Sequence, residues 1–269
     1  MPYQLTHAGR IFYDQRGSGP PVVMLPAALH DHADFDAVAE RLADRYTTIA
    51  VDWPGHGRSD PASGGRPADA LGLAGVLSEL TDRLDLPPAV LIGNSVGGFA
   101  AARLALDQPH RVAGLVLVNS GGFTRPTAVT RLGTRVLGSP RANRQLYPRL
   151  VPRYMKPRND HDRAITEHVR ALARTAEGAR TSAALWRSFG TPGFDLRAEA
   201  DRLGAPVLLV WGERDIILPP AAGRETHAAI PGSQLRMLPT GHVVFASDPD
   251  GFLDVARPFI AAAHQTVSR

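Results

Sequence analysis

The chain has 269 residues, of which 43% are hydrophobic, so it can bury a large core in one domain or two. It contains no cysteine, which excludes disulfides, thiolate catalysis and cysteine-ligated metals. No basic segment followed by an apolar stretch opens the sequence, and its apolar runs are too short to span a bilayer, so we expect a cytoplasmic protein without a membrane partner.

Strands alternate with helices through the first 121 residues. Apolar runs and turn residues predict an opening hairpin and buried strands, with helices between them. The strands are expected at 3–14, 22–25, 47–51, 90–92 and 112–118, and the helices at about 34–44, 68–84 and 99–105. This spacing favours an α/β protein with a mostly parallel twisted sheet and helices on both faces. Ligand chemistry in such sheets lies at the carboxyl ends of the strands.

The pattern changes between residues 122 and 192, which are rich in arginine and proline. Helices are expected near 127–137 and 160–188, without a buried strand, so the segment is interpreted as a helical cap or lid inserted over the sheet. The α/β pattern then resumes with a strand at 205–211, a helix at 220–229, a strand at 233–238 and a closing helix at 248–264. We therefore expect a core of residues 1–121 and 193–269 with a cap of residues 122–192.

Charge is unevenly spread between these two parts. The segment 122–192 holds 14 basic and 4 acidic residues, a net charge of +10, and the remainder carries −6. Its arginines could face solvent, bind the acidic core or a subunit interface, or fix a substrate carboxylate. Apolar positions such as Trp186 are expected to line a pocket for a neutral substrate. Aromatic residues are sparse and no recognition motif occurs there, so no nucleic-acid partner is expected.

Residues 93–97, Gly-Asn-Ser-Val-Gly, stand between a predicted strand and a predicted helix. This is the setting of a nucleophile elbow, in which Ser95 lies at the tip of a sharp turn with its hydroxyl exposed. A serine hydroxyl needs an adjacent base, and the base needs an orienting carboxylate. Asp215 and His242 each follow a predicted strand at the same sheet edge, so Ser95, Asp215 and His242 are the predicted catalytic triad.

Four segments together resemble the α/β-hydrolase superfamily along nearly the whole chain. They are the elbow at 93–98, the Asp-x-x-Gly-x-Gly-x-Ser loop at 52–59, the Gly-Glu-Arg-Asp turn at 212–215 and the histidine loop at 241–249. The resemblance implies a hydrolase core with an inserted lid and no cofactor. The family usually has His-Gly after the strand at 22–25, where this chain has Pro26 and Ala27.

The predicted oxyanion hole uses backbone amides, which survive side-chain changes. They are the amides of Val96, at the start of the elbow helix, and of Ala28, with Ala27 as the next choice. The stretch His30-Asp31-His32 lacks the third ligand and the spacing of a zinc site, so no metal is expected and His30 or His32 could contact substrate. The residues proposed to bind substrate are Ala27, His30, His32, Asn94, Trp186 and Val243.

The predicted function is hydrolysis of a small-molecule ester, lactone or related carbonyl compound. The elbow also resembles that of hydrolases that cleave carbon–carbon bonds, but those usually carry an aromatic residue after the histidine, where this chain has Val243. The alternative is a protein of the same fold that binds a small ligand without hydrolysing it. The sequence does not distinguish a monomer from a homo-oligomer.

Overall fold

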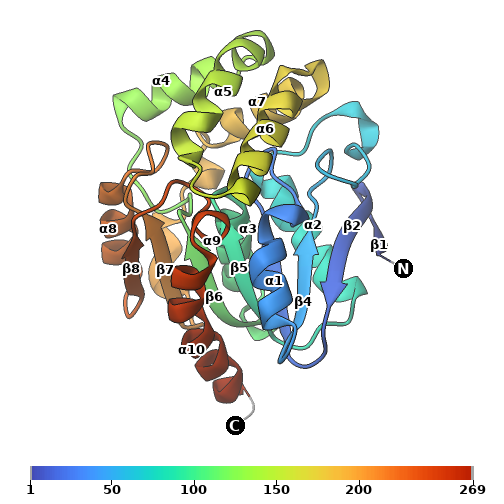
Figure 1. Cartoon of the computed structure of the whole chain (residues 1–269), viewed down its shortest axis with the longest axis vertical. Helices are drawn as coiled ribbons and strands as arrows, with labels where there is room; N and C mark the ends of the chain where they lie inside the picture. Colours follow the sequence, from blue (N-terminus) through green and yellow to red (C-terminus); the bar gives the residue numbers. More distant parts are fainter. Residues whose placement is uncertain (1, 268–269) are drawn as a thin grey trace.

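The computed structural model describes residues 2–267, and within them eight strands form one twisted sheet (Figure 1). Its spatial order is β1-β2-β4-β3-β5-β6-β7-β8, antiparallel from β1 to β4 and parallel from there on. The strands are β1 Tyr3–Thr6, β2 Gly9–Arg16, β3 Pro21–Leu25, β4 Thr47–Val51, β5 Ala89–Asn94, β6 Val112–Val118, β7 Val207–Gly212 and β8 Gln234–Leu238. The predicted fold class is confirmed.

Helices cover both faces of this sheet, because its central strands alternate their side chains between two buried layers. In β3, Val23 and Leu25 pack on the side of α2 and α3, whereas Val22 and Met24 pack on the side of α1 and α10. The helices of the core are α1 Asp36–Leu42, α2 Ala70–Arg83, α3 Val96–Asp107, α8 Pro220–Ala229, α9 Val244–Ser247 and α10 Pro249–Val267. Among residues 2–267, no helix has the length and apolar character needed to cross a bilayer.

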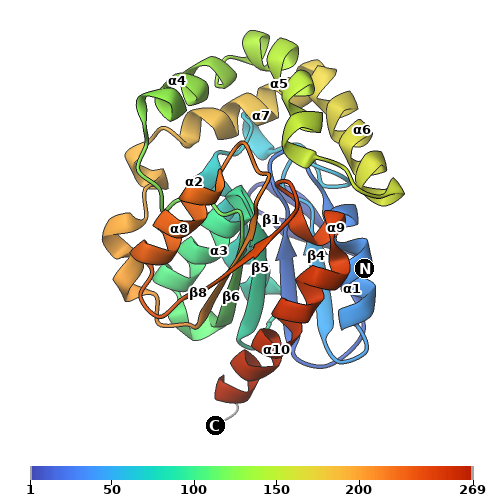
Figure 2. The ribbon, with the colours of Figure 1, turned by 60° about the vertical axis from the view of Figure 1, so that its left-hand side comes forward.

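Four further helices lie together above the carboxyl ends of the strands (Figures 1 and 2). They are α4 Ala128–Leu137, α5 Pro140–Met155, α6 Asp160–Arg174 and α7 Ala176–Ser188, which we call the four-helix insertion. The helices expected near 127–137 and 160–188 are present, but the second is broken in two at Thr175, whose hydroxyl accepts from the Gly178 amide to cap α7 (2.9 Å).

The helix α5 is absent from the sequence-based prediction. Pro148 and Pro152 lie inside it, and proline in a helix removes a hydrogen bond and crowds the preceding turn. The helix persists because its inner face is buried: Tyr147, Val151 and Tyr154 are at most 4% exposed. Tertiary packing therefore outweighs the local preference against helix in this segment.

Polar contacts fasten the insertion to the core. The buried Asp162 carboxylate accepts from the Ser247 hydroxyl at 2.7 Å, and the Ser188 hydroxyl accepts from the Ala70 amide at 3.1 Å. The exposed His168 of α6 places its Nε2 3.2 Å from the carboxylate of the buried Asp31. The hydrogen bond to Asp31 raises the pKa of His168. Burial alone would raise the pKa of Asp31, but the hydrogen bond from His168 reverses this and lowers it.

We expect this contact to stabilise the fold more strongly when His168 is protonated. A histidine whose pKa is raised on folding stabilises the folded state fully below its unfolded pKa, about 6.5, and loses that contribution as the pH rises through the folded value. The variant His168→Gln should therefore melt below the wild type at about pH 6, and this gap should narrow at about pH 9. The exposed His110→Gln is the control, and a gap that does not depend on pH would contradict the assignment.

Candidate active site

The turn at Ser95 is held in a strained conformation by close backbone packing. Ser95 has φ 56° and ψ −114°, lies between β5 and α3, and is only partly buried. A Cβ on Gly93 would lie 2.5 Å from the Gly97 carbonyl oxygen, and one on Gly97 would lie 2.3 Å from the Leu25 carbonyl oxygen. Glycine is therefore required at both positions, and the turn presents the Ser95 side chain at the carboxyl end of β5.

Asp215 and His242 form a buried pair at the same sheet edge. His242 Nδ1 lies 2.6 Å from Asp215 Oδ2, and their residues are 4% and 3% exposed. The other oxygen of Asp215 accepts from the amides of Ile217 (2.7 Å) and Leu218 (3.3 Å). With both oxygens engaged, the carboxylate is fixed in orientation and orients the imidazole in turn.

Asn119 completes the setting of this carboxylate. Its side-chain amide donates to Asp215 Oδ2, and its own oxygen accepts from the Gly212 amide at 2.8 Å. Asn119 follows β6 with φ 42°. Its positioning role depends on the approach of β6 to β7, which no local pattern shows.

Asn94 connects the elbow to the histidine loop. Its fully buried side-chain amide donates to the carbonyls of Val118 and His242, each at 3.0 Å. Among the described residues no hydrogen bond joins Ser95 to His242 directly, so this amide is the polar link between their two segments. Val243, the next residue, is completely buried.

The loop after β3 packs directly on the elbow. The Pro26 carbonyl, at the position where the family has histidine, accepts from the Trp53 indole at 2.8 Å. A Cβ on Gly97 would also lie 2.8 Å from this carbonyl oxygen, so the loop and the start of α3 touch through backbone. Ala27 and Ala28, next in the chain, are 3% and 6% exposed.

His30 belongs to a second buried carboxylate–imidazole pair, which the sequence did not indicate. Its Nδ1 lies 2.5 Å from Asp34 and its Nε2 lies 3.1 Å from the Tyr154 hydroxyl of α5. The Tyr154 hydroxyl is 3.4 Å from that of Tyr147, which in turn donates to the Ala28 carbonyl at 3.5 Å. Both nitrogens of His30 are therefore occupied by protein, and the network joins the predicted oxyanion loop to α5.

Burial keeps these tyrosines protonated. It raises the pKa of Tyr147 to about 12 and that of Tyr154 well above its ordinary value. Both hydroxyls therefore remain hydrogen-bond donors at neutral pH.

His32 lies in a different polar cluster, with Asp31 and Asp52. Their ligand-type atoms all lie within 4.8 Å of one another, close enough to hold an ion. Each group nevertheless has protein partners. His32 Nδ1 lies 2.8 Å from Asp52 Oδ1, and Asp52 Oδ2 accepts from the Arg58 amide at 2.7 Å. Asp31 accepts from the Ala33 amide and faces His168. The cluster works as a junction that holds the loops after β3 and β4.

Aromatic rings run in an unbroken series from the elbow helix to His242. Each ring centroid lies between 4.5 and 6.1 Å from the next. The series consists of Phe99, Phe194, Phe189, Trp186, Tyr147, Tyr154 and His242. The Trp186 indole nitrogen is buried without a partner among the described residues. The series forms a largely apolar aromatic layer between the insertion and the core, in which the Trp186 N–H is, among the described residues, a free hydrogen-bond donor.

The packing of the elbow gives a direct test. Gly97→Ala should destabilise the protein by about 3 kcal/mol or more, because the new methyl group meets backbone that cannot move aside. Gly133→Ala, in α4 with nothing within 4 Å of the new Cβ, should instead raise stability by up to about 1 kcal/mol. Urea unfolding of both variants measures the difference. Equal stabilities would show that the contact at Gly97 is not tight.

Comparison with known proteins assigns the chain to a family. A family model described as alpha/beta hydrolase fold matches residues 20–249. An uncharacterized protein of Mycobacterium tuberculosis is 28% identical over 97% of this chain and 81% of its own length. A pimeloyl-acyl-carrier-protein methyl ester esterase of Nitrosomonas europaea is 30% identical over 90% of this chain and 96% of its own. The enol-lactonase of Burkholderia xenovorans LB400 shares the fold, with a TM-score of 0.79 at 22% identity over 97% of this chain and 100% of its own. The chain therefore belongs to the α/β-hydrolase fold family and is a hydrolase.

Proposed function

We propose that the chain is a serine hydrolase that cleaves neutral esters or lactones with Ser95 as nucleophile, His242 as base and Asp215 as orienting acid. The observation that carries this proposal is the buried Asp215–His242 pair, 2.6 Å apart, at the sheet edge where the strained turn presents Ser95. Asn94, bonded to the His242 carbonyl, ties the two halves together.

In the proposed reaction, the free nitrogen of His242 takes the Ser95 proton while Oγ bonds to the substrate carbonyl carbon. The carbonyl electron pair moves onto oxygen, and the imidazolium is stabilised by Asp215. The leaving alcohol takes its proton from His242 as the carbon–oxygen bond breaks, which leaves an acyl-serine. A water molecule then gives a proton to His242 and attacks, and Ser95 leaves with that proton as the acid is released.

The negative oxygen would be held by the backbone amides of Val96 and Ala28. Two features support this choice. Val96 is the first residue of α3, where amides lack helical partners, and the loop that carries Ala28 touches the elbow backbone at Gly97. The Tyr147 hydroxyl, bonded to the Ala28 carbonyl, would fix the orientation of that peptide.

The four-helix insertion would serve as a lid over an apolar acyl site. The aromatic series that begins at Phe99 and ends at His242 supports a neutral substrate, because a carboxylate against these rings would lose its hydration and find no arginine or lysine among them. The unpartnered Trp186 nitrogen would donate to a polar atom of that substrate. The methyl ester esterase and the enol-lactonase to which the chain is similar bear names of the proposed reaction class, and this similarity supports the proposal.

Loss of the nucleophile tests the chemistry. Ser95→Ala should abolish hydrolysis of a chromogenic ester, and His242→Ala and Asp215→Asn should each lower kcat by about 10³-fold or more. The exposed Ser63→Ala and His110→Gln are matched controls that should keep full activity. Fluorophosphonate should label Ser95 alone. Full ester turnover by Ser95→Ala would disprove the proposal, and so would tight ligand binding without turnover by the wild type.

Matched substrates test the acyl site. We expect kcat/KM to be about tenfold or more higher for a neutral ester than for the same ester with a terminal carboxylate, because the aromatic series offers no cationic side chain to the charge. Trp186→Phe should raise KM for a substrate with a polar acceptor and leave kcat nearly unchanged. A carboxylate preference that persists at high salt would instead indicate an arginine inside the site.

A further inference from the structure

The helix α4 turns an apolar stripe outward. Val129, Leu132 and Val136 follow one another at helical spacing and are 80%, 62% and 36% exposed. A helix of a globular protein normally buries such a stripe against its neighbours. Leu146 of α5 adds a further aliphatic side chain that is 45% exposed. Half of the eight large hydrophobic side chains exposed among the described residues therefore lie on these two helices.

The same two helices carry arginines whose side chains are unpaired. Arg131 and Arg135 of α4 and Arg141 and Arg144 of α5 are exposed, and none of their side chains makes a hydrogen bond or ion pair among the described residues. Neither helix contains an acidic residue. Arginines four positions apart, such as Arg131 and Arg135, repel each other on a helix surface. A partner that supplies negative charge would relieve this repulsion.

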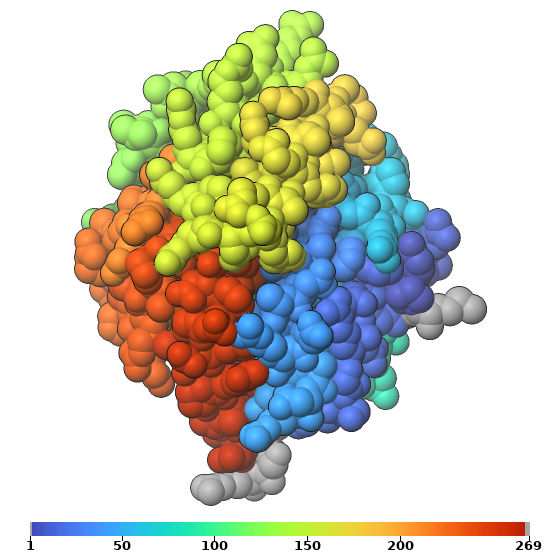
Figure 3. Space-filling model, in the orientation of Figure 1, coloured from blue at the N-terminus to red at the C-terminus, as the bar shows by residue number. Residues whose placement is uncertain are grey.

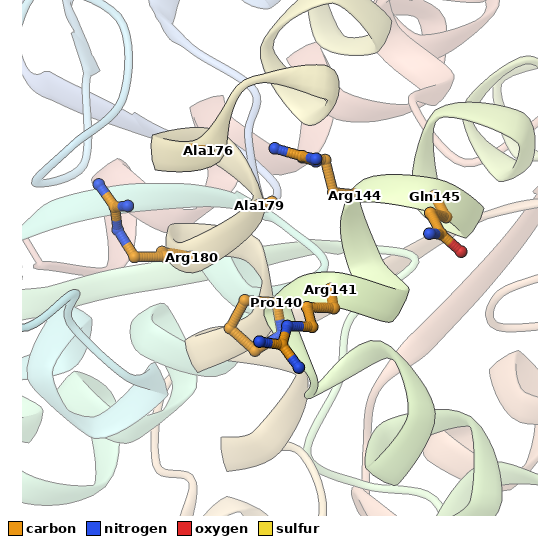
Figure 4. Close-up of a pocket in the computed structure, with 7 residues that line it drawn as sticks. All are labelled: Pro140, Arg141, Arg144, Gln145, Ala176, Ala179 and Arg180. Atoms are coloured by element: carbon orange, nitrogen blue, oxygen red, sulfur yellow. The ribbon is translucent and has the colours of Figure 1, made fainter.

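Two open hollows lie beside α5 on the outer side of the insertion. One, of about 510 Å³ between α5 and α7, is bordered by Arg141, Arg144 and Arg180 (Figure 4). The other, of about 450 Å³ between α5 and α6, shares Arg144 and adds Arg149 and Arg174. Neither is lined by Ser95, Asp215 or His242, so both are separate from the proposed catalytic site.

We propose that the outer face of α4 and α5 docks on an anionic lipid surface. The apolar stripe of α4 enters the boundary of the acyl chains, and the arginines of both helices pair with lipid phosphates, as in amphipathic helices that lie in the membrane plane. Both helices lie at one end of the molecule, where such a surface can reach them (Figures 1 and 3). Peripheral docking differs from spanning, and it departs from the sequence-based expectation of no membrane partner.

Other occupants fit these features less well. A symmetric pairing with a second copy would bring the arginines of both copies into one interface that contains no acidic residue from either helix. Nucleic acid would use the arginines but not the aliphatic stripe. A protein partner would need a groove shaped to Val129 and Leu132, whereas lipid is deformable and needs none. The docking does not depend on the chemistry at Ser95.

Sedimentation with vesicles tests the proposal. The wild type should bind phosphatidylcholine vesicles that contain phosphatidylglycerol, should bind pure phosphatidylcholine weakly, and should dissociate as salt is raised. Arg131→Gln and Arg135→Gln should each weaken binding about fivefold, and Val129→Ser with Leu132→Ser should weaken it at least as much. Leu5→Ser and Arg45→Gln, exposed on the core, are matched controls that should bind like the wild type.

Several results would overturn it. One is a wild type that does not bind vesicles containing phosphatidylglycerol. Another is that the α4 variants bind these vesicles as tightly as the wild type and the control variants do. Binding of poly-glutamate, but not of vesicles, with the same dependence on Arg131 and Arg135 would identify a protein partner instead. Dimers in sedimentation velocity that Leu132→Ser dissolves, without vesicle binding, would identify self-association. Unchanged melting and ester turnover in solution show that each variant is folded.

Discussion

The backbone at the end of β3 packs against the backbone at the start of α3, and the candidate active site depends on this contact. The space at Gly97 is filled by the Leu25 and Pro26 carbonyls, so the elbow cannot relax and the loop after β3 cannot move away. The strained φ of Ser95 is thus imposed by packing on both sides of the turn. The contact is made by the backbone of Gly97 and by two carbonyl groups, and no side chain takes part. It is therefore compatible with Pro26 and Ala27, which stand where the family usually has His-Gly.

A second contact of this kind connects the insertion to the histidine loop. The amide of His242 donates to the Tyr154 carbonyl at 2.9 Å, and a Cβ on Gly241 would lie 2.2 Å from the Met155 carbonyl oxygen. The last carbonyls of a helix have no partner within it, and here the end of α5 supplies one of them to His242. The position of His242 is therefore set jointly by the sheet, through Asp215, and by the insertion.

The sequence was sufficient where local pattern and chain order carry the information. The sequence directly indicates the strand–turn–helix at Ser95 and the strands that end before Asp215 and His242. The order of these elements along the chain then predicts the fold. It was insufficient where distant segments meet. Nothing near His30 indicates Tyr154, which lies 124 residues away, and Asn119 gained its role from β7. The helix α5 could not be predicted, because its prolines argue locally against a helix, whereas the burial of its inner face depends on distant segments.

The helix α5 faces two environments at once. Its outer side carries Arg141 and Arg144 toward the open hollow, and its end holds the amide of His242. A ligand on the outer side and a ligand near His242 would therefore contact the same helix or a residue held by it. If the outer and the inner ligand each bind one position of this helix more tightly than another, the outer ligand changes the affinity for the inner one, and the inner ligand changes outer binding by the same factor.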